Sequence, residues 1–162
     1  MNSKTTLHFF CGKMAAGKST LAKELAEKHK AILLVEDDWL SELYPNEITN
    51  IPEYLQYSSR LQNVLSNHIK SLLSSNISVV LDFPANTENQ RAWFRSIFEA
   101  TNTSHTLHFV DKSNETCKHQ LKERNKNKPE GAAFTTDEEF DAITQYFQAP
   151  LEAEGLNIVR YE

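Results

Sequence analysis

Short apolar segments alternate along the chain with longer segments in which apolar positions recur every three or four residues. The apolar runs at residues 5–11, 31–35, 77–83 and 104–111 have strand length, and residues 156–162 form a fifth, shorter candidate. Most of these runs are apolar without alternation, which is typical of parallel strands covered on both faces. The pattern predicts a three-layer α/β/α protein with a mainly parallel, five-stranded sheet.

Helical periodicity fills the intervals between the predicted strands. We expect helices at residues 18–29, 52–75, 88–100, 113–125 and 137–148, and a short one that begins near Trp39. Two of them follow a capping box, formed by Thr87 with Gln90 and by Thr136 with Glu139. Strands that alternate with helices in this way are typical of a doubly covered sheet.

Composition places the chain among soluble proteins. Its 162 residues, of which 40% are hydrophobic and 24% charged, suit one domain, and we expect residues 1–162 to form it. No apolar stretch approaches the roughly 18 residues of a membrane span, and the N-terminus lacks a signal-peptide layout. Cys11 and Cys117 form no disulfide framework. We therefore expect a cytoplasmic protein without membrane association.

Charge is distributed unevenly around a net value of −5. Residues 31–59 contain no lysine or arginine, but they contain Glu36, Asp37, Asp38, Glu42, Glu47 and Glu53. From Lys112 to Lys128 basic residues outnumber acidic ones. An acidic chain is a poor candidate for binding duplex nucleic acid, whereas one local basic patch could bind a compact polyanion. Nucleic acid is thus an unfavoured, though not excluded, partner.

The segment GKMAAGKS at residues 12–19 fits the P-loop pattern G-x-x-x-x-G-K-[ST], between a predicted strand and a predicted helix. Glycine permits turns that aim backbone amides at phosphate, and the helix adds the positive end of its dipole. We expect Lys18 to neutralise the β- and γ-phosphates of ATP, and Ser19 to ligate Mg²⁺. The predicted nucleotide site comprises Gly12, Lys13, Met14, Ala15, Ala16, Gly17, Lys18, Ser19 and Thr20.

P-loops serve kinases, switches and motors, so the remaining chemistry must lie at the carboxyl ends of the other strands. Asp37 and Asp38 follow the second strand, and one of them could orient an acceptor hydroxyl and take its proton. Alternatively, this acidic turn only caps the short helix. Asp82 ends the third strand, where it could support Mg²⁺ or be a simple turn residue.

Several cations are candidates for binding phosphate or substrate. Arg91 could reach a substrate or be a surface arginine, and Arg60 could face the site from the long helix. Arg124 suits stabilisation of the moving phosphoryl group because its guanidinium can bind two oxygens at once, and Lys128 is a second candidate. A lid at about residues 122–136 could carry both.

Together, the segments GKMAAGKS, VEDDW, VVLDF with NTENQRAW, and LKERN resemble a family of small bacterial P-loop kinases with an AAA-type ATP-binding domain. That family is related to phage polynucleotide 5′-kinase, chloramphenicol phosphotransferase and zeta toxins. The resemblance implies a phosphate-binding Lys18, a Mg²⁺-binding Ser19, Asp37 as general base, Asp82 at the catalytic strand end, and Arg124 with Lys128 in the lid.

One position departs from the polynucleotide kinase pattern. In that pattern an arginine that binds the acceptor phosphate follows the catalytic acid by three residues, and Leu40 occupies this position here. A neutral or cationic small molecule therefore fits better than a phosphorylated nucleic acid end. The sequence predicts a Mg²⁺-dependent kinase that uses ATP to phosphorylate a hydroxyl of a metabolite or antibiotic. The alternatives are a polynucleotide or nucleotide kinase, and a nucleotide-binding switch without catalysis.

Overall fold

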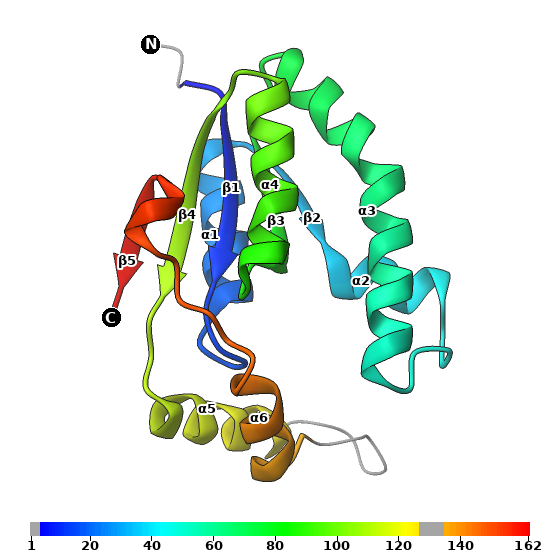
Figure 1. Ribbon diagram of the computed structural model, residues 1–162, viewed down its shortest axis with the longest axis vertical. Helices are drawn as coiled ribbons and strands as arrows, with labels where there is room; N and C mark the ends of the chain where they lie inside the picture. Colours follow the sequence, from blue (N-terminus) through cyan, green and yellow to red (C-terminus); the bar gives the residue numbers. More distant parts are fainter. Residues whose placement is uncertain (1–3, 127–134) are drawn as a thin grey trace.

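The computed structural model describes residues 4–126 and 135–162, and these contain one five-stranded sheet. Its strands are β1 (Thr6–Cys11), β2 (Ile32–Val35), β3 (Val79–Pro84), β4 (Ser104–Val110) and β5 (Ile158–Tyr161). The strand order is β2-β3-β1-β4-β5, and each neighbouring pair is parallel. The predicted parallel sheet is confirmed, and the carboxyl ends of its strands share one edge (Figure 1).

Helices cover both faces of the sheet, which confirms the three-layer prediction. In Figure 1, α4 lies in front of the sheet and α3 stands to its right, α1 lies behind the sheet, and α5 and α6 lie below the carboxyl ends of the strands; α3 and α4 pack on the same core. The helices are α1 (Lys18–His29), α2 (Glu36–Leu43), α3 (Ile51–Ser74), α4 (Glu88–Ala100), α5 (Asn114–Lys126) and α6 (Asp137–Thr144), and a 3₁₀ turn spans Glu152–Glu154. No helix in the described ranges has the length and apolarity needed to cross a membrane.

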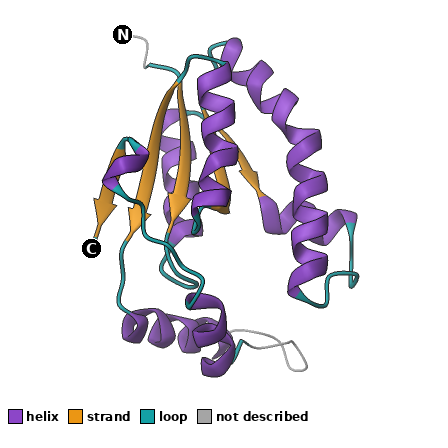
Figure 2. Ribbon diagram, in the orientation of Figure 1, coloured by secondary structure: helices purple, strands orange, loops and turns teal. Residues whose placement is uncertain are grey.

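Burial on both faces explains the unbroken apolar runs of the strands. On β1, Leu7, Phe9 and Cys11 join the large core beneath α3 and α4. Phe10 points the other way and packs with Ala22 of α1. Successive side chains of a strand alternate between faces, so a strand with helices on both sides needs apolar residues at nearly every position. Figure 2 shows the helical layers on either side of the strands.

Two helix boundaries differ from the prediction by more than one residue. Helix α2 begins at Glu36 rather than near Trp39, so the adjacent aspartates lie inside its first turn, where the helix dipole stabilises negative charge. Helix α6 ends at Thr144, four residues early. Beyond it, Phe147 packs against the main core and the Gln148 N–H donates to the Asn86 carbonyl at 2.8 Å. These tertiary contacts end the helix where periodicity alone would continue it.

Both predicted capping threonines are confirmed as N-caps. Thr87 accepts a hydrogen bond from the Gln90 N–H, and Thr136 accepts one from the Glu139 N–H. The Gln90 side chain does not complete its box, because its Oε1 accepts from the Asn86 N–H at 2.8 Å. The glutamine thus joins the loop after β3 to the start of α4.

A chain of buried polar rings lies on the α1 side of the sheet. His8 Nδ1 is 2.9 Å from His108 Nε2, and His108 Nδ1 is 2.8 Å from the Tyr161 hydroxyl. His8 also stacks on His29 with ring centroids 5.1 Å apart. Burial, and to a smaller extent the charges of neighbouring histidines, lower the pKa of both His8 and His108 to about 4. Both imidazoles are therefore neutral in the folded protein at neutral pH.

This histidine pair predicts acid sensitivity. The pKa is lower in the folded chain than the ordinary 6.5, so the unfolded chain binds protons first as the pH falls from 6.5 toward 4. The free energy of unfolding should then fall by up to about 1.4 kcal/mol per pH unit for each histidine. Urea unfolding across this interval tests the slope. His108→Gln should reduce the dependence of the free energy of unfolding on pH, whereas the same change at the exposed His68 should not. Equal slopes in the two variants would show that the buried histidines do not cause the acid sensitivity.

Candidate functional site

The loop at residues 12–19 joins β1 to α1 and is shaped by its glycines. A Cβ atom on Gly12 would lie 2.8 Å from the Val110 carbonyl oxygen, so no larger residue fits beside β4. Gly17 has a φ of 108° and precedes α1 as its N-cap. Among the described residues no side chain caps this helix, and its first turn carries no acid. The N-terminus of α1 is therefore suited to an anion.

The loop rests on the helices below the sheet. Met14 and Ala15 pack against a small apolar cluster that includes Leu121 of α5 and Phe140 of α6. The Gly12 N–H donates to Asn86 Oδ1 at 2.9 Å, which ties the loop to the segment after β3. Asn86 is not among the site residues predicted from the sequence. The one sequence feature that could have indicated it is its position just after a predicted strand.

Lys18 lies at the centre of the loop. Its ammonium group turns back and donates to the Gly12 carbonyl. Burial lowers the pKa of Lys18, while the negative charges of nearby groups, including Asp82 and Asp37, raise it. A desolvated ammonium favours an anionic ligand, because the ligand's charge replaces lost hydration.

Ser19 and Asp82 come together beside Lys18. The Ser19 hydroxyl donates to Asp82 Oδ2 at 2.8 Å and so joins the start of α1 to β3, in which Asp82 lies two residues before the end of the strand. Mg²⁺ prefers such oxygen donors and usually keeps water or phosphate oxygens as its other ligands. In the described ranges no group of three or more His, Cys, Asp or Glu side chains could hold a metal. The pair thus fits a cation that nucleotide phosphates help to bind.

Asp37 stands in the first turn of α2. Although its side chain reaches solvent, partial burial raises the pKa of Asp37, and so do the charges of Asp82 and Asp38. The positive charges of Arg124 and Lys18 lower it, so both cations lie within electrostatic reach of this carboxylate. The structure therefore brings four other sequence-predicted residues within electrostatic reach of Asp37: Asp38, Asp82, Lys18 and Arg124. A carboxylate with a raised pKa is suited to accept a proton.

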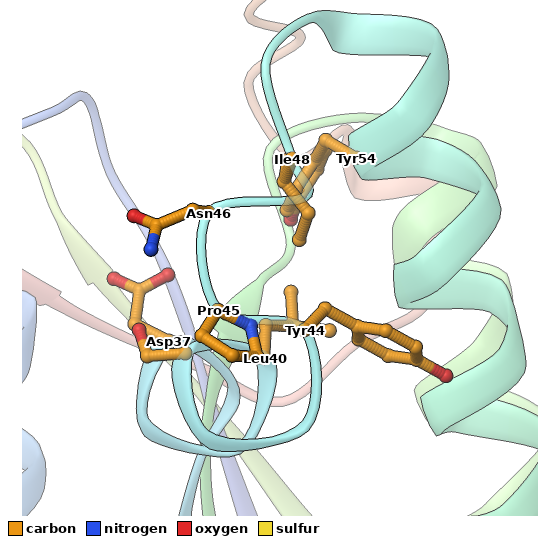
Figure 3. Close-up of a pocket in the computed structure, with 8 residues that line it drawn as sticks. Asp37, Leu40, Tyr44, Pro45, Asn46, Ile48 and Tyr54 are labelled. Carbon is orange, nitrogen blue, oxygen red and sulfur yellow. The ribbon is translucent and has the colours of Figure 1, made fainter.

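Asp37 also lines a pocket of about 600 Å³ between α2, the following loop and α3. The Asp37 carboxylate and the Asn46 amide lie on the same side of the view in Figure 3. The lining residues are Asp37, Leu40, Ser41, Tyr44, Pro45, Asn46, Ile48 and Tyr54. No lysine or arginine is among the described residues that line it.

The other predicted substrate contacts stand outside this pocket. Asp38 is exposed and does not line it. The Arg60 guanidinium lies 5.4 Å from the centroid of the Tyr57 ring, which stacks in turn on Tyr44. Arg60 is therefore linked to the pocket residue Tyr44 through Tyr57 and does not itself line the pocket. Lys128 and residues 127–134 of the expected lid lie outside the described residues.

For Arg91 the structure requires a correction. Its side chain is 2% exposed, so the interpretation as a surface arginine is wrong. The guanidinium binds the Glu154 carboxylate, with Nε 2.7 Å from Oε1, and it donates to the carbonyls of Ala85 and Gln148. Because protein acceptors engage it, Arg91 is not free to bind a substrate. It joins α4 to the C-terminal segment instead.

Solved kinase structures are similar to this fold over nearly its whole length. A putative kinase from Chloroflexus aurantiacus J-10-fl has a TM-score of 0.73 at 13% identity, with 98% of this chain and 88% of that chain covered. APS kinase from Mycobacterium tuberculosis, solved with AMPPNP and APS, has a TM-score of 0.66 at 17% identity (97% and 88% covered). A gluconokinase from Sinorhizobium meliloti 1021 has a TM-score of 0.63 at 16% identity (99% and 84% covered).

At these identities the likenesses establish the fold alone. No curated protein matches the sequence significantly. The sequence model of the AAA domain family matches residues 7–150, which is most of the chain and includes both the P-loop and Asp82. The protein therefore belongs to the AAA domain family and has the fold of the small P-loop kinases.

Proposed function

We propose that this protein is a kinase that transfers the γ-phosphoryl group of ATP to a hydroxyl of a small, non-anionic molecule. The observation that carries the proposal is the place of Asp37. Its carboxylate lines a pocket large enough for a small acceptor, and it lies within electrostatic reach of Lys18 in the P-loop. One carboxylate thus borders both an acceptor pocket and a phosphate site.

In this proposal the P-loop and Lys18 bind the triphosphate. The N-terminus of α1 and the loop amides face the phosphates, and the Lys18 ammonium neutralises charge on the β- and γ-phosphoryl groups. Mg²⁺, held by Ser19 and Asp82 together with phosphate oxygens, would neutralise further charge there. The 2.8 Å approach of the Ser19 hydroxyl to Asp82 supports this assignment.

Asp37 then acts on the acceptor. Its carboxylate hydrogen-bonds the acceptor hydroxyl and takes the proton as the oxygen forms its bond to the γ-phosphorus and the bond to ADP breaks. Arg124, at the end of α5, is within electrostatic reach of Asp37 and can stabilise the charge on the transferred group. The products are ADP and a phosphate monoester.

The pocket lining favours an acceptor without negative charge. Ser41 and Asn46 offer hydrogen bonds to hydroxyl or amine groups, while Leu40, Pro45 and Ile48 provide an apolar wall. An anionic acceptor would lie beside Asp37 with no lysine or arginine from the described lining residues to offset its charge. A neutral or amino-substituted alcohol matches these groups better than a nucleic acid end.

Replacing Asp37 by Asn should lower kcat by about 10²- to 10⁴-fold, because the amide cannot take the proton, while ATP affinity changes little. The measurement is ADP release with a library of neutral, cationic and phosphorylated alcohols. Asp38→Asn is the matched control, since Asp38 does not line the pocket, and it should retain most activity. Turnover that depends on Asp38 but not Asp37, or that occurs only with phosphorylated acceptors, would contradict the proposal.

Gly12→Ala should weaken binding of an ATP analogue by about tenfold or more, because the new Cβ would clash with the Val110 carbonyl and displace the loop. Isothermal titration calorimetry measures the affinity, and circular dichroism checks that the variant folds. Gly155→Ala is the control outside the loop: a Cβ there meets no atom within 4 Å, but the φ of 66° strains an alanine, so the variant reports the cost of a glycine replacement that does not touch the loop. Unchanged affinity in a folded Gly12→Ala variant would show that the loop does not bind the nucleotide.

A further inference from the structure

Glu36, the residue before Asp37, is a buried acid to which the proposed reaction assigns no role. Its side chain is 2% exposed at the junction of β2 and α2. The carboxylate accepts a hydrogen bond from the Tyr54 hydroxyl at Oε1 and one from the Ser58 hydroxyl at Oε2, the latter at 2.7 Å. We call these three side chains the Glu36 clamp.

No lysine or arginine among the described residues forms an ion pair with Glu36. Burial raises the pKa of Glu36, and the two hydroxyl donors oppose that shift. A buried carboxylate without a cation costs stability unless hydrogen bonds satisfy it. A glutamate that only filled space at this position would therefore lower the stability of the fold relative to an apolar residue.

The clamp connects two walls of the acceptor pocket. Tyr54 and Ser58 are four residues apart on one face of α3, and Tyr54 itself lines the pocket. On the opposite side, Glu36 is the first residue of α2, and Asp37 follows it directly. The clamp therefore fixes the first turn of α2 against α3 at the point where Asp37 enters the pocket.

We propose that Glu36 is a positioning residue for phosphoryl transfer, because its two hydrogen bonds to α3 hold the Asp37 carboxylate at a fixed place relative to the acceptor. This inference rests on the proposed function. An ionised carboxylate offers an acceptor oxygen to each hydroxyl, whereas the amide of a glutamine offers only one oxygen. Because the Tyr54 and Ser58 hydroxyls contact different oxygens of Glu36, a glutamine in the same place would set its NH₂ group, a donor, against one of the two hydroxyl groups.

Substitutions in the Glu36 clamp should change the kinetics with respect to the acceptor and leave ATP binding unchanged. The P-loop lies between β1 and α1 and has no part in the Glu36 hydrogen bonds. A displacement of Asp37 by about 1 Å is enough to lower the rate by 10- to 100-fold. We expect that fall in kcat/KM for the acceptor, with an unchanged dissociation constant for ATP.

The test uses Glu36→Gln together with the milder Tyr54→Phe and Ser58→Ala, so that one unfolded variant does not decide the outcome. Hydrogen exchange of the α2 amides, measured by mass spectrometry, reports on the clamp without requiring turnover. Steady-state kinetics with acceptor and ATP varied separately report on positioning. Ser66→Ala is the matched control, because this α3 serine also makes hydrogen bonds, to Gln62 and Trp93, but lies outside the pocket lining.

We expect faster α2 exchange and lower acceptor kcat/KM in the clamp variants, and neither change in Ser66→Ala. Unchanged α2 exchange would overturn the clamp itself. Faster exchange with normal acceptor kinetics would overturn the positioning role and leave the proposed function intact. If the wild-type protein phosphorylates no acceptor, the proposed function fails and the positioning role fails with it.

Discussion

The hydrogen bond from the Ser19 hydroxyl to the Asp82 carboxylate is the contact on which the site depends. It joins the start of α1 to the C-terminal half of β3, 63 residues further along the chain. The contact exists because β1 pairs in parallel with β3, so the loops that follow both strands meet at one edge. Strand β2 pairs with β3 on its other side and delivers Asp37 to the same edge. Sheet order thus determines which side chains can cooperate.

The charged groups of Lys18 and Asp37 are incompletely solvated at this edge of the sheet. Burial lowers the pKa of Lys18 and raises that of Asp37, so each group is shifted toward its neutral form. Nucleotide phosphates would favour the charged form of the lysine, while an acceptor hydroxyl would offer its proton to the acid. Fixed charges that are only partly compensated before binding are suited to catalysis, because little reorganisation is needed during the reaction. In the proposed reaction the lysine and the aspartate thus have complementary chemical tasks at one edge of the sheet.

Features that follow from local pattern could be predicted from the sequence. The apolar runs predict the strands, the spacing of Gly12, Gly17 and Lys18 predicts the phosphate loop, and the strand-end rule singles out Asp37 and Asp82. Features fixed by distant partners could not be predicted. Arg91 is buried because Glu154 lies beside it in the fold, and Glu36 is indistinguishable in sequence from the solvated acids around it until α3 supplies two hydroxyl donors. The early end of α6 depends likewise on the packing of Phe147 against the core.

The most direct test of the central claim is a crystal structure with Mg²⁺ and a non-hydrolysable ATP analogue. The proposed mechanism predicts the triphosphate within the loop at residues 12–19, with the cation beside Ser19 and Asp82. It also predicts that the Asp37 carboxylate faces the γ-phosphoryl group across the mouth of the acceptor pocket. Phosphates bound elsewhere, or an Asp37 carboxylate directed away from the γ-phosphoryl group, would contradict it.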